Sequence, residues 1–339
     1  MKIALTYNLK EKDSSKPPDY FSEFDSQETI NAVINALQLK GHEAEAVNVC
    51  GTDIFDYFKK NKIDIVFNMA EGKAGRLRES EIPAILDYLD VPYTGSNTFS
   101  LALALNKGLT KKILKADNIP TPNFQLFVKG TENLNPELKF PLIVKPNCEG
   151  SAKGINKTNV VESKEGLFEK IKELKSVYKQ DVLAEEFIEG KELTVGVLGN
   201  SNITVLPILE IDFSECVKSG EYFYSWRMKE FQGNSDLGLN PAFHCPARLD
   251  KETEILVKQT ALKTHHAIGC LDISRTDIRL DKNNIPYVLE INPLPGLDPK
   301  ESNLPIMAYA AGMKFEDLIN SILTTAYERS FSKKKIKVA

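Results

Sequence analysis

The sequence S-R-T-D-I-R-L-D-K-N-N-I-P-Y-V-L-E-I-N-P-L-P-G-L, residues 274–297, decides how the rest of the chain is interpreted. Two apolar, β-branched runs flank the polar D-K-N-N turn, which predicts a pair of hairpin strands. Because side chains alternate between the faces of a strand, Glu290 and Asn292 share a face that Asp277 can join. Two carboxylates and an amide oxygen form an oxygen-only cluster suited to Mg2+, and Arg275 beside it supplies a cation for developing negative charge. An ordinary solvated hairpin face is the alternative interpretation.

Length and composition indicate a soluble, cytoplasmic protein of two or three domains. The chain has 339 residues, of which 42% are hydrophobic and 27% charged, as in ordinary globular proteins. A formal net charge of -4 argues against nucleic-acid binding, which calls for a basic face. The five cysteines show no metal-ligand spacing and are typical of reduced thiols. No apolar run approaches the roughly 18 residues of a membrane span, and the start, M-K-I-A-L-T-Y, has the pattern of a strand and not of a signal peptide.

The N-terminal part of the chain predicts a Rossmann-like domain without a dinucleotide site. A strand at 2–7 and a long polar loop precede a helix that we expect to begin at a capping box formed by Asp25 and Glu28. A second amphipathic segment at 54–58 and a strand at 63–68 continue the β-α alternation, which implies a parallel sheet. The sequence contains no G-x-G pair, so the dinucleotide fingerprint is absent.

The loop N-M-A-E-G-K-A-G-R-L-R-E-S, residues 68–80, follows the last of these strands. Open α/β sheets place their ligands at the C-terminal ends of strands, so this loop is a candidate substrate contact. Its charged side chains are Glu71, Arg76, Arg78 and Glu79. A solvated charged loop is the alternative. Beyond it, V-P-Y-T-G-S leads into what we expect to be one helix carrying Lys107.

The segment F-P-L-I-V-K-P-N-C-E-G-S-A-K-G-I, residues 140–155, predicts a phosphate contact. A buried strand ends at Lys145, where a lysine is a point charge for phosphates. The following loop contains Ser151 between glycines and can bring backbone N–H groups close to phosphate oxygens. It is not a P-loop, because G-x-x-x-x-G-K-[ST] occurs nowhere in the chain.

Two short strands at 182–187 and 192–198 follow, and their edge offers backbone groups that can pair with a purine. Glu185 and Glu192 are candidates to receive ribose hydroxyls, although they can also be ordinary strand-end charges. Residues 221–232, E-Y-F-Y-S-W-R-M-K-E-F-Q, are aromatic, charged and contain the only Trp, which favours a lid over a plain connector.

The rest of the sequence predicts two helices and a frayed C-terminal end. A helix at 251–268 is capped by Asp250 and Gly269, and a last helix spans 314–327. The predicted class is α/β and α+β. The predicted domains are a Rossmann-like substrate-side domain, a central lobe, a C-terminal lobe with the metal site and a basic tail, over 1–95, 96–185, 186–330 and 331–339.

Taken in order, these motifs resemble the D-alanine–D-alanine ligase family of ATP-grasp enzymes over residues 63–327. The matching pieces are V-P-Y-T-G-S with Lys107, L-I-V-K-P with G-S-A-K-G-I, E-E-F-I-E-G-K-E-L-T-V-G-V-L-G, F-Y-S-W-R-M-K, S-R-T-D and E-I-N-P-L-P-G-L. The resemblance implies an ATP-grasp fold with ATP between the central and C-terminal lobes. It implies that ATP phosphorylates a carboxylate and that an amine attacks the acyl phosphate. Small-molecule carboxylate and amine substrates, two Mg2+ ions, with Mn2+ possible in their place, and a homodimer are also expected.

The resemblance assigns roles residue by residue. Lys107, Lys145 and the lid lysine Lys229 resemble the lysines that bind the ATP phosphates. The nucleotide-side residues are Glu185, Glu186, Ile188 and Glu192. Asp277, Glu290 and Asn292 match the Mg2+ ligands, and Arg275 matches the arginine that stabilises the tetrahedral oxyanion. Ser151, Gly296 and Ser302 match positions near the substrates.

The departures from the family lie at the amino-acid site. The usual E-x-E-V-S run is replaced by Y-F-S-E-F-D-S-Q-E, which leaves Glu23, Asp25 and Glu28 as candidates to hold the first substrate's ammonium. The usual H-G-x-x-G-E-D-G loop is replaced by residues 68–80, and Glu230 replaces the tyrosine after the lid lysine. We therefore expect a related ligase with a different carboxylate or amine partner. Arg76 and Arg78 could then hold an acidic or larger acyl donor.

Other functions stay open at the level of sequence. A true D-alanine–D-alanine ligase of peptidoglycan precursors is one alternative. A nucleotide-binding regulatory protein would be expected to have lost Lys145 or a metal ligand, and none is lost. A protein that docks a carrier would favour a basic surface, for which the Lys333–Lys337 tail is the only support in the sequence.

Overall fold

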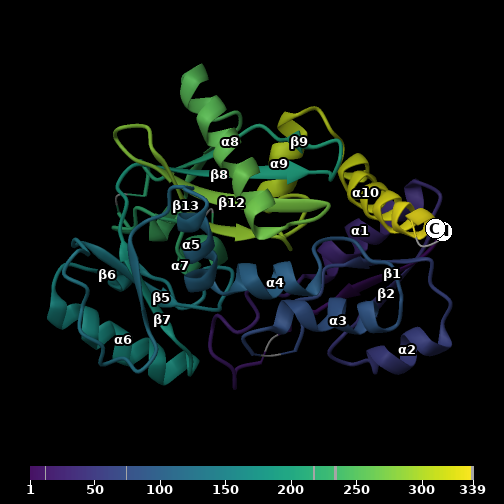
Figure 1. Ribbon diagram of the computed structural model, residues 1–339, viewed down its shortest axis with the longest axis horizontal. Helices are drawn as coiled ribbons and strands as arrows, with labels where there is room; N and C mark the ends of the chain where they lie inside the picture. Colours follow the sequence, from purple (N-terminus) through teal and green to yellow (C-terminus); the bar gives the residue numbers. More distant parts are fainter. Residues whose placement is uncertain (12, 74, 217, 233–234, 337–339) are drawn as a thin grey trace.

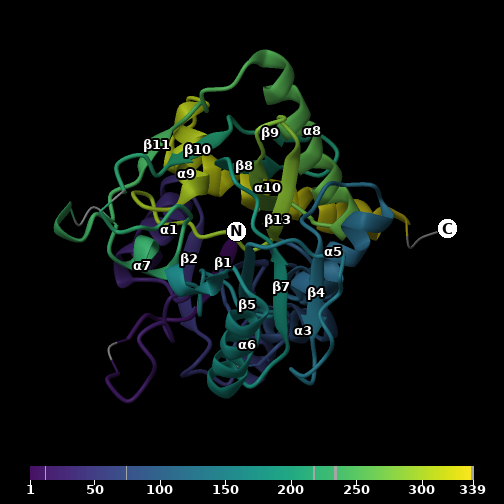
Figure 2. The ribbon, with the colours of Figure 1, turned by 90° about the vertical axis from the view of Figure 1, so that its left-hand side faces the viewer.

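The computed structural model describes residues 1–339 apart from 12, 74, 217, 233–234 and 337–339 (Figure 1). Its strands form three sheets, and Figure 1 shows the largest of them above the two smaller ones. Figure 2, turned by 90°, places the four-stranded sheet and its helix beneath the large sheet. The mixed α/β architecture agrees with the predicted fold class.

The N-terminal sheet is parallel, in the order β2-β1-β3. Its strands and helices are β1 (Lys2–Tyr7), β2 (Glu43–Asn48), β3 (Ile65–Asn68), α1 (Gln27–Leu39), α2 (Ile54–Lys60), η1 (Arg78–Ser80) and α3 (Glu81–Tyr88). Alternating side chains of β1 explain the two-sided burial: Ile3 and Leu5 pack towards α1, and Ala4 packs towards α2. The parallel sheet is confirmed, but β2 was missed because E-A-E-A-V-N carries one fully buried side chain, Val47.

The start of α1 differs from the predicted capping box. Ser26 is the N-cap, and its side chain accepts a hydrogen bond from the Thr29 N–H. Asp25 lies one residue earlier in extended backbone, where it pairs with Asn8 and Lys10 through backbone hydrogen bonds. The pairing fixes the end of the long N-terminal loop, residues 8–24, against α1.

The helix expected to carry Lys107 is two helices, α4 (Thr98–Leu105) and α5 (Lys107–Ala116). Asn106 separates them, with a ψ of 87° that is outside the helical range. Its side chain then caps α5 by accepting from Leu109 N–H. The break places Lys107 at the first position of a new helix, facing the lobe that follows.

The central lobe is an antiparallel sheet in the order β4-β7-β5-β6, packed against one helix. The elements are β4 (Phe124–Phe127), β5 (Leu142–Pro146), η2 (Lys157–Asn159), β6 (Val160–Val161), α6 (Lys164–Tyr178) and β7 (Val182–Glu186). Leu167, Ile171 and Leu174 of α6 are spaced at helical intervals and bury one face against the sheet.

The large sheet follows the path β11-β10-β8-β12-β13, with β9 paired to β8. Its elements are β8 (Lys191–Leu198), β9 (Thr204–Val205), β10 (Leu209–Asp212), α7 (Trp226–Glu230), η3 (Ser235–Leu237), β11 (Ala242–His244), α8 (Lys251–Ile268), β12 (Ile273–Leu280) and β13 (Pro286–Asn292). The hairpin is confirmed: β12 and β13 are antiparallel, with Asp277 opposite Glu290 and Arg275 opposite Asn292. Helix α8 is bounded as expected by Asp250 and Gly269.

Two helices complete the chain. Helix α9 (Asn303–Ala310), which sequence reasoning missed, packs on β8, and α10 (Phe315–Ile336) packs on α1. Helix α10 continues to Ile336, beyond the predicted end at Tyr327, and the remainder of the predicted tail lies outside the described residues. None of the helices in the described part of the chain has the length and apolar character needed to span a membrane.

Candidate active site

Two cavities meet where the three sheets converge. The larger, of about 530 Å3, extends from the N-terminal loop to the β12–β13 hairpin. The narrower, of about 90 Å3, lies between β5, β7, β8 and the hairpin. Residues that line both are Lys107, Glu149, Tyr224, Lys229, Arg275, Glu290 and Asn303. Four of these seven are predicted site residues, and two of them, Arg275 and Glu290, place the hairpin at the junction of the two cavities.

The predicted metal-binding residues converge on the hairpin. Asp277 accepts two hydrogen bonds from Arg275, at 3.0 and 2.9 Å, and one from Thr194 Oγ1 at 2.7 Å. Asn292 Nδ2 donates to Asp277 at 3.2 Å. Glu290 lies opposite Asp277 in the hairpin, and its pKa is held well below the usual range because four cations outweigh the effect of its burial. The donor set is oxygen-rich and ionised, which fits Mg2+.

The lysines of the junction come from two helices. Lys107, at the start of α5, is buried, donates to the Glu149 carbonyl and lies 3.3 Å from Glu290 Oε2. Lys229 lies on α7, with its Nζ 5.1 Å from the centre of the Tyr224 ring. No described carboxylate forms an ion pair with Lys229. Burial, together with Arg275, lowers its pKa.

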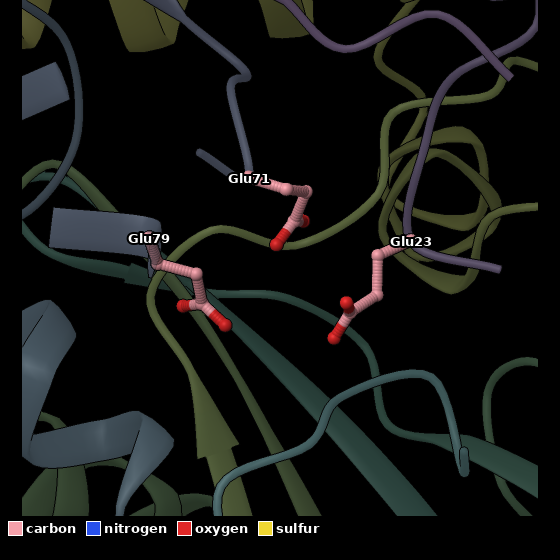
Figure 3. A group of neighbouring side chains, drawn as sticks. All are labelled: Glu23, Glu71 and Glu79. Carbon is pink, nitrogen blue, oxygen red and sulfur yellow. The ribbon is translucent and has the colours of Figure 1, made fainter. Parts of the chain in front are cut away.

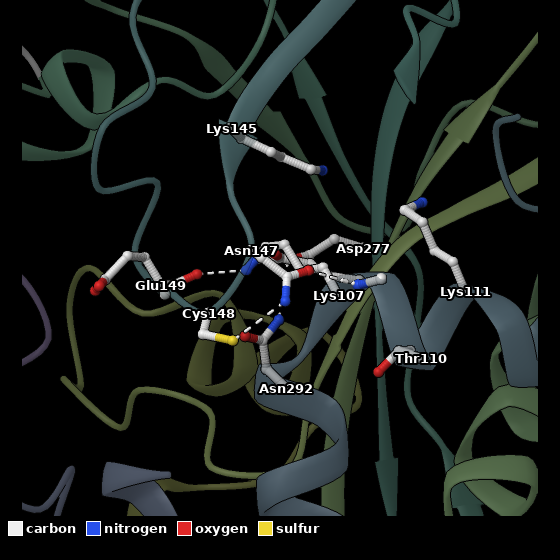
Figure 4. Close-up of polar contacts among 12 residues, drawn as sticks. Lys107, Thr110, Lys111, Lys145, Asn147, Cys148, Glu149, Asp277 and Asn292 are labelled. Carbon is white, nitrogen blue, oxygen red and sulfur yellow. Dashed lines mark hydrogen bonds and ion pairs between the residues drawn. The ribbon is translucent and has the colours of Figure 1, made fainter. Parts of the chain in front are cut away.

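Lys145 is part of a buried charge triad that the sequence did not reveal. Glu185 Oε1 lies 2.5 Å from Lys145 Nζ, and Glu185 Oε2 lies 2.7 Å from Lys111 Nζ. Lys111 also donates to Thr121 Oγ1 at 2.8 Å, and it is fully buried. Figure 4 shows Lys111 and Lys107 projecting from α5 and Lys145 from β5. Burial lowers the pKa of Lys111 to about 8 although Glu185 opposes the shift.

The other predicted nucleotide residues also line the narrower cavity. Glu192 lies 2.9 Å from Arg279 and accepts from the Tyr224 N–H. Glu186 accepts from Lys139 N–H and Asn123, and Ile188 lines the same cavity.

The glycine-rich loop is engaged by acids of the N-terminal loop. Ser151 adopts a positive φ of 46° and lines the larger cavity. Gly150 N–H donates to Glu23 Oε1 at 2.8 Å, and Gly154 N–H donates to Asp19 Oδ2 at 3.0 Å. The N–H groups at the two ends of this loop are therefore occupied by carboxylates of residues 8–24.

Glu23 is already bound to two basic side chains. Arg78 donates to both of its oxygens, and Lys153 Nζ lies 3.3 Å away. Arg78 also donates to the Cys148 carbonyl, and Arg76 is exposed beside Asp181 at 3.5 Å. Neither arginine lines the larger cavity, so their placement does not support the expectation that they bind an acidic donor.

Two further acids from the 68–80 loop face the cavity. Figure 3 shows the carboxyl groups of Glu71, Glu79 and Glu23 pointing towards one another, and one oxygen of each lies within 4.8 Å of the others. Burial and the neighbouring Glu23 raise the pKa of Glu79 to about 7, with Arg78 opposing, and burial with Glu79 raises the pKa of Glu71 well above its usual range. The surroundings therefore disfavour the ionised forms of Glu71 and Glu79, as expected for crowded acids without basic partners.

The remaining predicted substrate residues also line the larger cavity. They are Gly296, Ser302, Glu28 and Asp25. Ser302 is the N-cap residue of α9, and its Oγ accepts from Asp298 N–H at 3.0 Å. A Cβ on Gly296 would lie 2.9 Å from Ser302 Oγ, which explains the glycine. Burial and Asp298 raise the pKa of Asp25 to about 7.

The predicted lid contacts the N-terminal loop across the larger cavity. Trp226 Nε1 donates to Ser22 Oγ at 2.7 Å, and Lys10 Nζ lies 3.1 Å from Glu230. Glu230, which replaces the family's tyrosine, thus connects the predicted lid to the N-terminal loop.

Sequence reasoning missed several residues of this site, namely Lys111, Glu149, Lys153, Arg279 and Asn303. Lys111 lies one helical turn after Lys107, a spacing that predicts neighbouring side chains once α5 is recognised. Arg279 shares the strand of Arg275 and Asp277. No sequence pattern indicated that Asn303 belongs to the site, because helix α9 itself was not predicted.

Comparison with known proteins points to one family. The family model described as D-ala D-ala ligase C-terminus matches residues 113–324. A protein of Carboxydothermus hydrogenoformans named D-alanine--D-alanine ligase is 38% identical over 313 residues, covering 89% of this chain and 94% of its own. Uncharacterized protein y4sG of Sinorhizobium fredii is 33% identical over 308 residues, covering 89% of this chain and 88% of its own.

A solved structure shares the fold over almost the full length. The crystal structure of D-alanine--D-alanine ligase from Bacillus anthracis complexed with ATP superposes with a TM-score of 0.73 at 27% identity. The match covers 98% of this chain and 99% of that one.

Proposed function

The chain belongs to the D-alanine–D-alanine ligase family, and from this premise we propose how its residues carry out the reaction. The family makes it an ATP-dependent ligase that joins a carboxylate to an amine, forms a C–N bond and releases ADP. Its substrates are small molecules of the amino-acid type. The proposal concerns which residues bind each reactant.

ATP occupies the narrower cavity, with its terminal phosphate at the junction. Lys107, Lys145 and Lys229 bind the phosphates, since phosphoryl transfer depends on positioned cations around the phosphate oxygens. The edge formed by Glu186 and Ile188 meets the base, and Glu192 meets the ribose. The observation that carries this assignment is the environment of Glu290, whose pKa is lowered by Lys107, Lys145, Lys229 and Arg275 together.

Asp277, Glu290 and Asn292 would hold Mg2+, which when bound neutralises phosphate charge. For the metal to bind, the contacts of Asp277 with Arg275 and Asn292 must rearrange, because they occupy its carboxylate oxygens. The number of ions, expected to be two, is part of the proposal.

The two substrates meet in the larger cavity beside Arg275. A carboxylate oxygen of the first substrate attacks the terminal phosphorus of ATP, and ADP leaves. The amine nitrogen of the second substrate then attacks the acyl carbon, phosphate leaves and the nitrogen loses a proton. Arg275 stabilises the oxyanion of the tetrahedral intermediate, while Ser151 and the Ser302–Gly296 turn position the substrates.

ADP release measured with and without an amine acceptor tests the proposal, with mass detection of the ligated product. We expect Glu290→Gln to lower kcat by about 100-fold or more, because the site loses a charged ligand at the phosphates. Glu137→Gln is the matched control, since Glu137 is exposed on the central lobe. Unchanged activity in Glu290→Gln would contradict the assignment and favour a nucleotide-binding protein without turnover.

A further inference from the structure

We propose that one substrate of the larger cavity carries an additional cationic group, an ammonium or guanidinium on its side chain, held by Glu71 and Glu79. This inference rests on the proposed function, because it names the class of molecule that the same cavity accepts. It concerns a group that takes no part in the reaction.

The charge of the cavity wall is the first observation. Among the described residues that line it, ten are acidic and five are basic. Three of the basic residues, Lys107, Lys229 and Arg275, lie at the junction, where the proposed function assigns them to phosphates and the oxyanion. The end formed by the N-terminal loop and the 68–80 loop is therefore strongly acidic.

The second observation is the difference between Glu23 and its two neighbours. Glu23 is bound by Arg78, Lys153 and the Gly150 N–H. Glu71 and Glu79 have no hydrogen bond to their carboxyl groups and no ion pair with any residue that the structure describes. Three carboxylates this close repel one another unless a cation lies between them or they take up protons. The arginine and lysine of the neighbourhood are already used by Glu23 and Glu149.

Asn303 gives an independent sign that the cavity receives a polar ligand. Its side chain, of a residue only 8% exposed, lies in the part of α9 that lines both cavities. No described residue makes a hydrogen bond with this amide. An amide that faces a cavity without a protein partner is free to bind a polar group of a ligand there.

A substrate cation fits the two acids better than a divalent metal ion. Calcium takes six to eight oxygen ligands, and magnesium demands near-ideal octahedral geometry. Of the three carboxylates here, Glu23 already accepts from Arg78 with both oxygens, which leaves two acids. Two carboxylates on the wall of a cavity of about 530 Å3 match one ammonium or guanidinium group.

Matched substrate pairs test this inference. Lysine and norleucine, and arginine and citrulline, differ in side-chain charge at similar size, and each is supplied in both stereochemistries with alanine as co-substrate. We expect at least one basic member to exceed its neutral partner in kcat/KM by about 10-fold or more, as for a hydrogen bond to a charged group. Glu71→Gln and Glu79→Gln should reduce that ratio towards one, and Glu137→Gln should preserve it.

Calorimetric binding of the same four amino acids to the full chain distinguishes a failure of the proposed function from a failure of the inference about the cationic group. Absence of ADP release with charge-dependent binding retained would overturn the proposed function and leave the inference standing. Turnover or binding that is equal within both pairs, or absent for all four amino acids, would overturn the inference. Ca2+ or Mg2+ bound without nucleotide and lost in Glu71→Gln would assign the acids to a metal ion, which also overturns it. Circular dichroism of each variant confirms that it is folded.

Discussion

The nucleotide end and the substrate end of this site handle charge in opposite ways. At the nucleotide end the acids have basic partners: Glu185 lies between Lys111 and Lys145, and Glu192 lies beside Arg279. In the acid cluster of the substrate end, Glu23 has basic partners, while Glu71 and Glu79 face the cavity without a basic partner among the described residues.

This difference shows what each end requires from its ligand. Paired acids hold the lysines of the nucleotide end in place, so that their charge is positioned before ATP arrives. At the junction, Lys229 has no described acid partner, which suits a site that receives a phosphate. The substrate end has an excess of acidic groups over basic ones, which suits a ligand that brings a cation.

Removing the unpaired lysine of the lid should have the largest effect. We expect Lys229→Met to lower kcat/KM for ATP by about 100-fold or more, because a charged donor to the transferred phosphate is lost. Steady-state ADP release measures it. Lys218→Met is the control, since Lys218 is exposed in the segment that precedes the lid. Equal losses in the two variants would mean that Lys229 has no special place at the phosphate.

The paired acids of the nucleotide end should contribute to stability. In Lys111→Met, Glu185 loses one of its two buried cations, and breaking a buried ion pair costs about 3 kcal/mol of unfolding free energy. Urea denaturation measures the change, and Lys112→Met, exposed on the same helix, is the control. A loss below 1 kcal/mol would indicate that Lys145 alone neutralises Glu185.

Removing an unpaired acid should instead raise the free energy of unfolding. Burial raises the pKa of Glu79 to about 7 in the folded protein, above its value of 4.5 in the unfolded chain. A raised acid pKa contributes stability that is complete below 4.5 and is lost as the pH rises through 7.

Glu79→Gln should therefore stabilise the free protein by roughly 1 to 3 kcal/mol at pH 8, and by much less at pH 5. Thermal unfolding of wild type and variant at both pH values measures the difference. A stabilisation that is the same at pH 5 and pH 8 would show that the ionised Glu79 is not under repulsion. Together with the Lys111→Met result, it tests whether removing a charged side chain destabilises the protein at the nucleotide end and stabilises it at the substrate end.

The sequence predicts those features of the fold and the site that depend on neighbouring residues. Local patterns identify the hairpin, the capped helix α8 and the strand that ends at Lys145, because their signals lie within a few residues. The break at Asn106 was missed, although Asn favours helix N-caps, because Leu101, Leu105 and Leu109 continue at helical spacing across it. Strand β2 was missed because half of its side chains are polar and only one, Val47, is buried.

The substrate end depends on contacts between distant segments. Arg78 binds Glu23 across 55 residues, and Gly150 approaches the same acid across 127. Nothing in the 68–80 loop distinguishes the arginine that is buried in the protein from the acids that face the cavity. The charge of a loop is therefore readable from the sequence, but its partners are not.

The smallest effect is expected where the two ends touch. Lys10 and Glu230 join the N-terminal loop to the lid, with 43% and 32% of their side chains exposed, and exposed ion pairs contribute less than about 1 kcal/mol. A double-mutant cycle with Lys10→Met and Glu230→Gln should therefore give a coupling of less than about fivefold in KM. The bond from Trp226 to Ser22 is more enclosed, so Trp226→Phe should raise KM by more than either surface variant. If the coupling between Lys10 and Glu230 reached 100-fold instead, the ion pair would hold the cavity closed, and the two ends would act as a single unit.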